Sequence, residues 1–163
     1  MKPQRIRYGK LLFLLLSILL VNGPISADHP APSPAGLDAA TNRYSVNTTK
    51  PYDDVVDDLE FAISQNNYRI TGRNEIGKAI AEGENITYPR SIIIHFCNLQ
   101  VAREIFDLNP DFLLHMPCRI SLRETQGGVL IEARLVPEVD PALQEVALRI
   151  NAMMRGIADY AAE

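Results

Sequence analysis

The stretch from Ser91 to Cys118 constrains this chain more than any other part. It contains both cysteines, two of the three histidines and the most apolar run outside the N-terminus. Ile92, Ile93 and Ile94 place β-branched apolar side chains on both sides of an expected strand. We therefore expect a central strand whose two faces are both covered, followed by a helix that Asn98 caps.

Alternation and helical spacing predict further elements on both sides of this stretch. Alternating apolar residues predict strands at 43–49 and 68–73, and a hairpin formed by 118–122 and 129–135. Apolar residues at helical spacing predict helices at 52–66, 75–81, 98–109 and from 140 onward. The predicted fold is therefore α+β: a single antiparallel or mixed sheet of about five strands packed with about four helices, in the order β-α-β-α-β-α-β-β-α.

Two details of these elements depend on glycines. Gly83 is expected to end the helix that begins at residue 75. Gly127 and Gly128 are expected to form a two-residue turn between the last two strands. That turn would set Arg123 opposite Glu132 as a cross-strand pair of opposite charge.

The first 27 residues have the order of a secretory signal peptide. Met1–Lys10 is basic, Leu11–Val21 is apolar except for Ser17, and the small residue Ala27 stands at the expected cleavage point. The apolar run is shorter than the roughly 20 residues that a membrane-spanning helix needs. We therefore expect a periplasmic or secreted protein that meets the membrane only through this segment before cleavage, with a retained anchor as the alternative.

The remaining chain is expected to consist of a tether and one domain. Residues 28–42 contain Pro30, Pro32 and Pro34 among small side chains and predict a tether, and residues 43–163 predict a single α+β domain. Without the signal segment, 12 of the 16 basic residues remain against all 20 acidic residues, a net charge of about −8. So acidic a surface repels phosphate backbones, and nucleic acid is not an expected partner.

The candidate site residues are His95, Cys97, His115, Met116 and Cys118. His95 and Cys97 are two apart on the expected strand and project from the same face. His115, Met116 and Cys118 stand at the beginning of the next strand. We expect these two strand ends to be neighbours and to bring the five side chains together.

Three hypotheses account for this cluster. The first is a structural disulfide between Cys97 and Cys118, or two buried thiols, because an oxidising compartment favours pairing. The second is a copper or haem site, because thiolate, imidazole and thioether groups suit copper(I) or an axial position on haem iron. The third is thiol-based redox or sulfur-transfer catalysis, with Cys97 as a nucleophile whose pKa a helix N-terminus lowers and His95 as its base.

The sequence contains no motif that assigns a reaction. It has no glycine-rich phosphate loop, no zinc-protease helix and no serine-nucleophile elbow. We therefore expect a non-enzymatic binding or accessory protein with an unknown ligand. Arg119, Arg123 and Arg134 are expected on one face of the hairpin, where an anion could bind, but Glu132 between them favours an ordinary salt-bridged surface.

Three short segments resemble the bacterial domain of unknown function 302 family. They are the Phe96-Cys97-Asn98 turn, the helix end at Asn109-Pro110 and the strand entry Met116-Pro117-Cys118-Arg119-Ile120. The resemblance covers about residues 44–137. It implies a compact α+β domain that is often secreted by bacteria and can be a homodimer, and it brings no established activity or catalytic residue.

Overall fold

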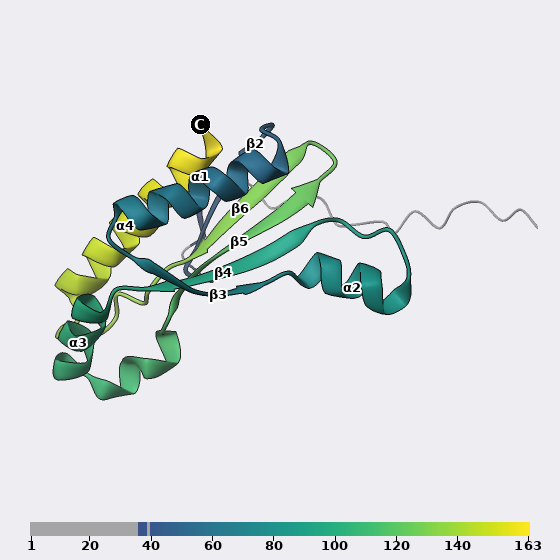
Figure 1. Cartoon of the computed structure of the whole chain (residues 1–163). Coiled ribbons are helices and arrows are strands. Elements are labelled where there is room, and N and C mark those ends of the chain that lie inside the picture. The colour runs from purple at the N-terminus through teal and green to yellow at the C-terminus, as the bar shows by residue number, and fades with distance from the viewer. Residues whose placement is uncertain (1–35, 39) are drawn as a thin grey trace, which may run out of the picture. The chain divides into compact units, whose positions relative to one another are not determined.

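The computed structural model describes residues 36–38 and 40–163, so the predicted signal peptide and residues 28–35 of the predicted tether lie outside the described part. In chain order the elements are β1 (Gly36–Asp38), β2 (Arg43–Thr48), α1 (Tyr52–Gln65), β3 (Arg69–Asn74), α2 (Ile76–Glu84), β4 (Ser91–Cys97), α3 (Leu99–Leu108), the 3-10 helix η1 (Pro110–His115), β5 (Cys118–Thr125), β6 (Gly128–Arg134) and α4 (Gln144–Ala162) (Figure 1). The predicted α+β class and order of elements are confirmed, and β1 and η1 are additions to them.

All strands belong to one antiparallel sheet with the order β1-β2-β6-β5-β4-β3. The short strand β1 lies in the segment predicted as a tether and pairs with β2. Because β2 pairs with β6, the sheet joins the first long strand of the domain to the last one. The predicted single sheet is confirmed.

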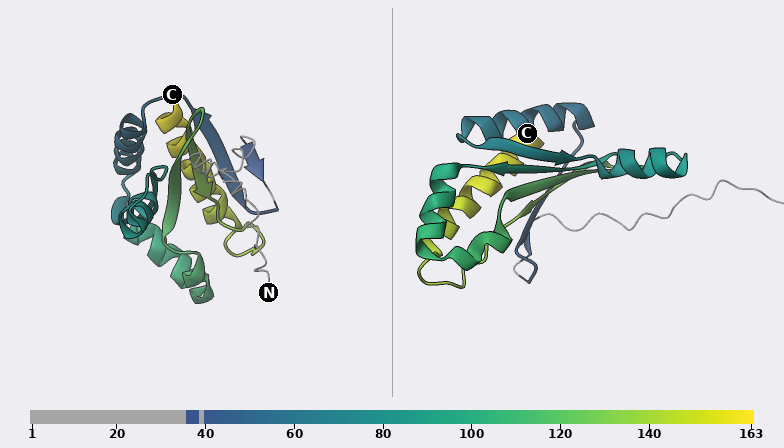
Figure 2. Two further views of the ribbon diagram at one scale, coloured as in Figure 1. Left: turned by 90° about the vertical axis from the view of Figure 1, so that its right-hand side faces the viewer. Right: turned by 60° about the horizontal axis from the view of Figure 1, so that its bottom comes forward.

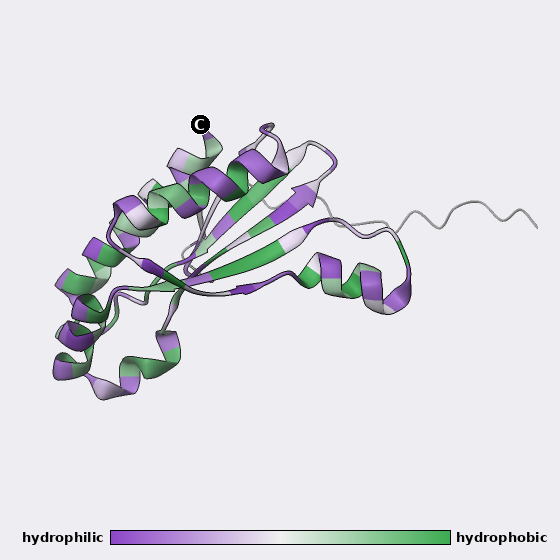
Figure 3. Cartoon of the chain, in the orientation of Figure 1, coloured by the Kyte–Doolittle hydropathy of each residue, from purple (hydrophilic) through white to green (hydrophobic). Residues whose placement is uncertain are grey.

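Helices α1 and α4 lie side by side along one face of the sheet, as the two orientations in Figures 1 and 2 show. The strand residues toward these helices are apolar and fully buried, among them Ile94, Phe96, Ile120 and Leu122. In Figure 3 both helices carry hydrophobic and hydrophilic stripes, which is the pattern of a helix with one side in a core. None of the described helices is long and apolar enough to cross a bilayer.

Strand β4 is covered less completely than its sequence predicts. Its burial alternates: Ile92, Ile94 and Phe96 are buried, whereas Ile93 and His95 are half-buried. The strand also lies between β5 and the edge strand β3 and is not at the centre of the sheet. The prediction of a central strand with both faces covered is therefore wrong, because an apolar run alone does not distinguish full burial from burial of one face.

The β5–β6 hairpin is longer than predicted, and its register differs by two residues. The strands extend to Thr125 and Gly128, so Arg123 is opposite Leu130 and Glu132 is opposite Ser121. The predicted Arg123–Glu132 pair is therefore wrong. Gly128 belongs to the strand: its φ is +134°, and a Cβ there would lie 2.1 Å from the Thr48 carbonyl oxygen.

Gly83 also has a different role from the predicted one. It lies inside α2, which continues to Glu84 and ends at Asn85 in the left-handed conformation (φ 52°). Asparagine tolerates this conformation better than most residues, so it ends a helix as glycine does.

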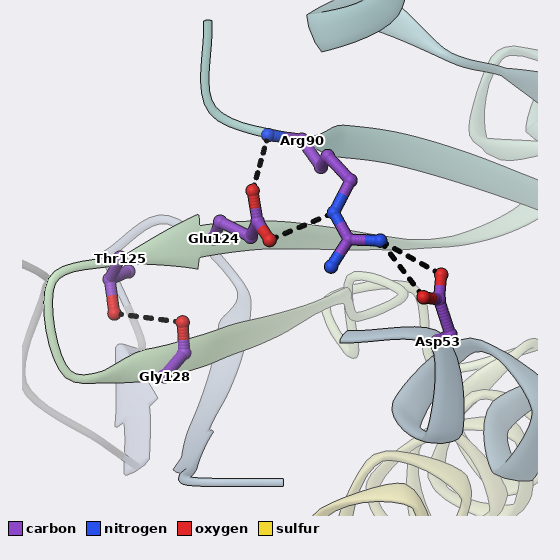
Figure 4. A network of polar contacts seen from close by, with 5 residues as sticks. All are labelled: Asp53, Arg90, Glu124, Thr125 and Gly128. Atoms are coloured by element: carbon purple, nitrogen blue, oxygen red, sulfur yellow. Dashed lines mark hydrogen bonds and ion pairs between the residues drawn. The ribbon is translucent and has the colours of Figure 1, made fainter. Parts of the chain in front are cut away.

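A polar clamp joins the start of α1 to the β4–β5 end of the sheet (Figure 4). The Arg90 guanidinium donates to Glu124 Oε1 at 2.8 Å and to the Asp53 carboxylate at 2.9 and 3.0 Å. The same guanidinium lies 4.3 Å from the centre of the Tyr52 ring. Burial is the main cause that raises the pKa of Tyr52 to about 12, so its ring stays neutral beneath the arginine.

Candidate functional site

Four of the five predicted site residues line one cavity between α3, η1 and the ends of β4 and β5. These are Cys97, His115, Met116 and Cys118. The other lining side chains are mostly apolar: Tyr68, Asn98, Val101, Ala102, Ile105, Phe112, Pro117, Val136 and Ile150. The predicted meeting of the two strand ends is therefore present in the structure.

Local structure explains why Cys97 and Cys118 meet. Cys97 is the last residue of β4 and Cys118 is the first of β5, and Phe96 is the direct cross-strand partner of Cys118. In a regular strand Cys97 would point away from the face that Phe96 and Cys118 share. At the end of β4, where Asn98 begins the next helix, Cys97 instead lines the same cavity as Cys118.

Both cysteines are free thiols in the structure, and their surroundings favour the protonated form. Burial raises the pKa of the Cys97 thiol. Burial also raises the pKa of Cys118 to about 11, with a smaller contribution from the charge of Cys97. The hypothesis of thiol catalysis expected a lowered pKa at Cys97, and the structure has the opposite shift.

His95 does not join the cluster. It is in register with Arg119 on β5 and Gly72 on β3, and it is not among the residues that line the cavity. The cavity therefore brings Cys97 together with His115, Met116 and Cys118, but not with His95.

His115 lies at the outer side of the cluster. It is exposed, and its ring centre is 4.7 Å from that of Phe112. It also lines a smaller cavity that includes Cys118, Arg119 and Arg134. Its imidazole is therefore open to solvent on one side.

The volume of the cavity and the side chains that line it limit what it can hold. Its free volume is about 20 Å³, which is room for one or two water molecules. Pockets for drug-sized molecules are roughly 300–1,000 Å³, so the cavity does not fit a haem. Within residues 36–38 and 40–163, no group of three His, Cys, Asp or Glu side chains is arranged to hold a metal ion.

Tyr68 is a residue of this cavity that the sequence analysis did not single out. Its ring packs edge-on against Phe96 with the centres 5.8 Å apart. Burial is the largest cause that raises the pKa of Tyr68 to about 12, and the two cysteine charges add to it. One sequence signal could have identified Tyr68 as a cavity residue: it stands just before β3. The next residue, Arg69, is the cross-strand partner of Cys97.

Comparison with known proteins agrees with this fold. Among curated proteins none matches the chain. A crystal structure described as an uncharacterized conserved protein DUF302 from Bacillus stearothermophilus is similar, with a TM-score of 0.66 and 19% identity over 75% of this chain and 98% of that one. The family model of the domain of unknown function DUF302 matches residues 44–161, which extends the resemblance seen in the sequence to include α4. The chain therefore belongs to the DUF302 family.

Proposed function

We propose that this chain is an exported, non-enzymatic accessory protein in which Cys97 and Cys118 form a structural pair that closes one end of the sheet. The observation that carries the proposal is that both cysteines line one small, mostly apolar cavity. The raised pKa of each thiol supports a structural role, since a nucleophilic or redox-active cysteine needs a stable thiolate near neutral pH.

Strand geometry is compatible with pairing. Cys97 is one residue beyond the cross-strand partner of Cys118. From an inter-strand spacing of about 4.8 Å and a rise of about 3.3 Å per residue, the two Cα atoms should lie about 6 Å apart. Disulfides commonly join Cα atoms at about 4.4–6.8 Å. Closing this loop would stabilise the domain by about 3 kcal/mol on the chain-entropy estimate.

A thiol count tests the proposed pair. The mature chain, made in an oxidising compartment and purified without reductant, should show no free thiol after denaturation. Its mass should be lower than that of the reduced chain by two hydrogen atoms. The Cys97→Ser variant is the control, because it leaves one cysteine that must be counted. Two free thiols in the unreduced wild-type protein would refute the structural pair.

Copper(I) binding is the second candidate, because two thiols and the Met116 thioether line one cavity and soft sulfur ligands select copper(I). A metal ion would have to displace the thiol protons, so binding would release protons and weaken as the pH falls. The thiol count separates the two candidates, because a copper-binding protein needs both cysteines reduced.

A further inference from the structure

The face of the sheet opposite α1 and α4 is mainly polar and contains a second, larger hollow. It has a volume of about 390 Å³ and lies over β4, β5 and β6 near the β1–β2 turn. This size is in the range of small-molecule binding pockets. Its lining residues are Thr41, Arg43, Ile93, Arg119, Ser121, Glu132, Ala133 and Arg134.

The hollow has an excess of positive charge. Three guanidinium groups line it, from Arg43, Arg119 and Arg134, against the single carboxylate of Glu132. That carboxylate is already engaged, because Glu132 Oε1 lies 3.2 Å from Arg43 Nη1. Arg43 Nη2 also lies 3.6 Å from Asp38 Oδ2, so the positive excess of the hollow comes from Arg119 and Arg134. Glu132 therefore does not neutralise the other two arginines, contrary to the salt-bridged surface that the sequence favoured.

Arg119 and Arg134 face one another without a carboxylate between them. Ile120 is opposite Ala133, so Arg119 and Arg134 are the next positions of the two strands, and both also line the smaller cavity beside the hollow. Arg134 donates to the Thr41 carbonyl oxygen at 2.9 Å, and in the part of the chain that the structure describes Arg119 makes no ion pair. Like charges on adjacent strands are destabilising, and an anion between them would remove that cost.

Two buried polar atoms on this face also lack partners. Arg43 Nε and Ser45 Oγ have no hydrogen-bond partner among the described residues, and Ser45 is opposite Glu132 on the neighbouring strand. Most buried polar groups in proteins are hydrogen-bonded. Of the two residues only Arg43 lines the hollow, so its Nε is the donor there that lacks an acceptor.

We propose that this hollow binds a small organic anion through its carboxylate or phosphate groups. The Arg119 and Arg134 guanidiniums would hold one oxyanion, because the planar fork of an arginine matches two oxygens of such a group. Arg43 and the Ser121 hydroxyl would contact a second polar group, and the Ile93 side chain would contact the carbon skeleton. The site lies across the sheet from the core, and neither Cys97 nor Cys118 lines the hollow.

Citrate and glycerol 3-phosphate are the probes for this site, one with carboxylate groups and one with a phosphate group, used separately in calorimetric titrations of the mature chain. We expect saturable binding of at least one probe. Arg119→Ala should weaken it at least tenfold, and Arg119→Lys should restore part of it, because a lysine keeps the charge and loses the fork. The control is Arg103→Ala, which removes the same charge from the exposed surface of α3. It should leave the dissociation constant within twofold of the wild-type value.

Two results would overturn the proposal. One is that neither probe binds saturably to a wild-type protein with the circular dichroism of a folded domain. The other is that Arg119→Ala and Arg103→Ala weaken binding equally, which would mean that only the overall charge attracts the anion. Arg134→Ala provides a second test if Arg119→Ala does not fold, and the same tenfold loss is expected.

Discussion

Asn151 is a polar side chain in the middle of the buried face of α4, with an exposed fraction of 1%. Its Oδ1 accepts from the Val136 backbone N–H at 2.7 Å, and its Nδ2 donates to the Val136 carbonyl at 2.9 Å and to Glu138 Oε1 at 2.8 Å. The Asn151 side chain thus pairs both backbone groups of Val136, just after β6, as a neighbouring strand would. This explains how a buried amide is tolerated between Ala147 and Met154.

We expect Asn151→Ala to lower the free energy of unfolding by about 3 kcal/mol, because it leaves both backbone groups of buried Val136 unpaired. Urea denaturation followed by circular dichroism would measure the change. Asn47→Ala is a suitable control, since Asn47 is an exposed residue of β2 and should shift stability by about 0.5 kcal/mol or less. Equal effects of the two substitutions would contradict this role of Asn151.

At the scale of elements, Asn98 connects three parts of the candidate site. Its Oδ1 accepts from the backbone N–H groups of Gln100 at 2.9 Å and Val101 at 3.2 Å, and so caps α3. Its Nδ2 donates to the Asn67 carbonyl at 2.9 Å, in the turn before β3. Since Cys97 precedes this cap, the helix start and the position of the thiol are coupled.

Asn98→Ala should therefore cost about 1 kcal/mol of stability, the usual value for a lost helix cap. Asn98→Asp keeps the acceptor for α3 and adds a favourable charge at the helix N-terminus, so it should retain most of the wild-type stability. Denaturant midpoints of the two variants would test the difference. A loss in Asn98→Asp as large as that in Asn98→Ala would show that the bond to Asn67 matters more than the cap.

Local signals predicted the elements but not their pairing. Asn98 as a cap and the helical spacing of α1 and α4 depend on near neighbours in the chain, and these predictions are confirmed. The hairpin register depends on contacts formed only in the folded sheet, such as the close approach of Gly128 to Thr48. The helix η1 has local signals, since Asn109 caps it and Pro110 is its first residue, but they were taken only as the end of the preceding helix. Cys97 and Cys118 line one cavity, as the neighbouring ends of their strands led us to expect, and His95 is not among the residues that line it.

At the scale of the whole molecule, several leucines of α3 and η1 are exposed in the described part of the chain. Leu99 on α3 is 78% exposed and Leu114 on η1 is 87% exposed, with Leu108 and Leu113 also exposed nearby in the chain. Burying such side chains against a second chain would be favourable. The homodimer that the family resemblance implied remains a prediction, and this is the surface that we would expect it to use.

The last prediction is that residues 1–27 direct the export of the protein. A full-length protein with a C-terminal tag, expressed in a Gram-negative host, should appear in the periplasmic fraction with Asp28 as its first residue. Replacing Leu14 and Leu16 by arginine should prevent this, because charges interrupt the apolar run that a signal peptide needs. The matched control replaces the exposed Leu99 and Leu114 by arginine and should be exported normally. Uncleaved wild-type protein in the membrane fraction would show that the segment is a retained anchor.

The pairing of β2 with β6, and the packing of α4 on both, have a consequence for synthesis of the chain. Strand β2 can pair with β6 only after almost the entire polypeptide has been made, and the 19-residue helix α4 must follow before the core is closed. Contacts between such distant segments form late, so a nascent chain would leave the ribosome without a stable tertiary structure. If the predicted signal peptide directs the chain to a secretion channel that threads extended polypeptides, the channel would meet the chain before it had folded.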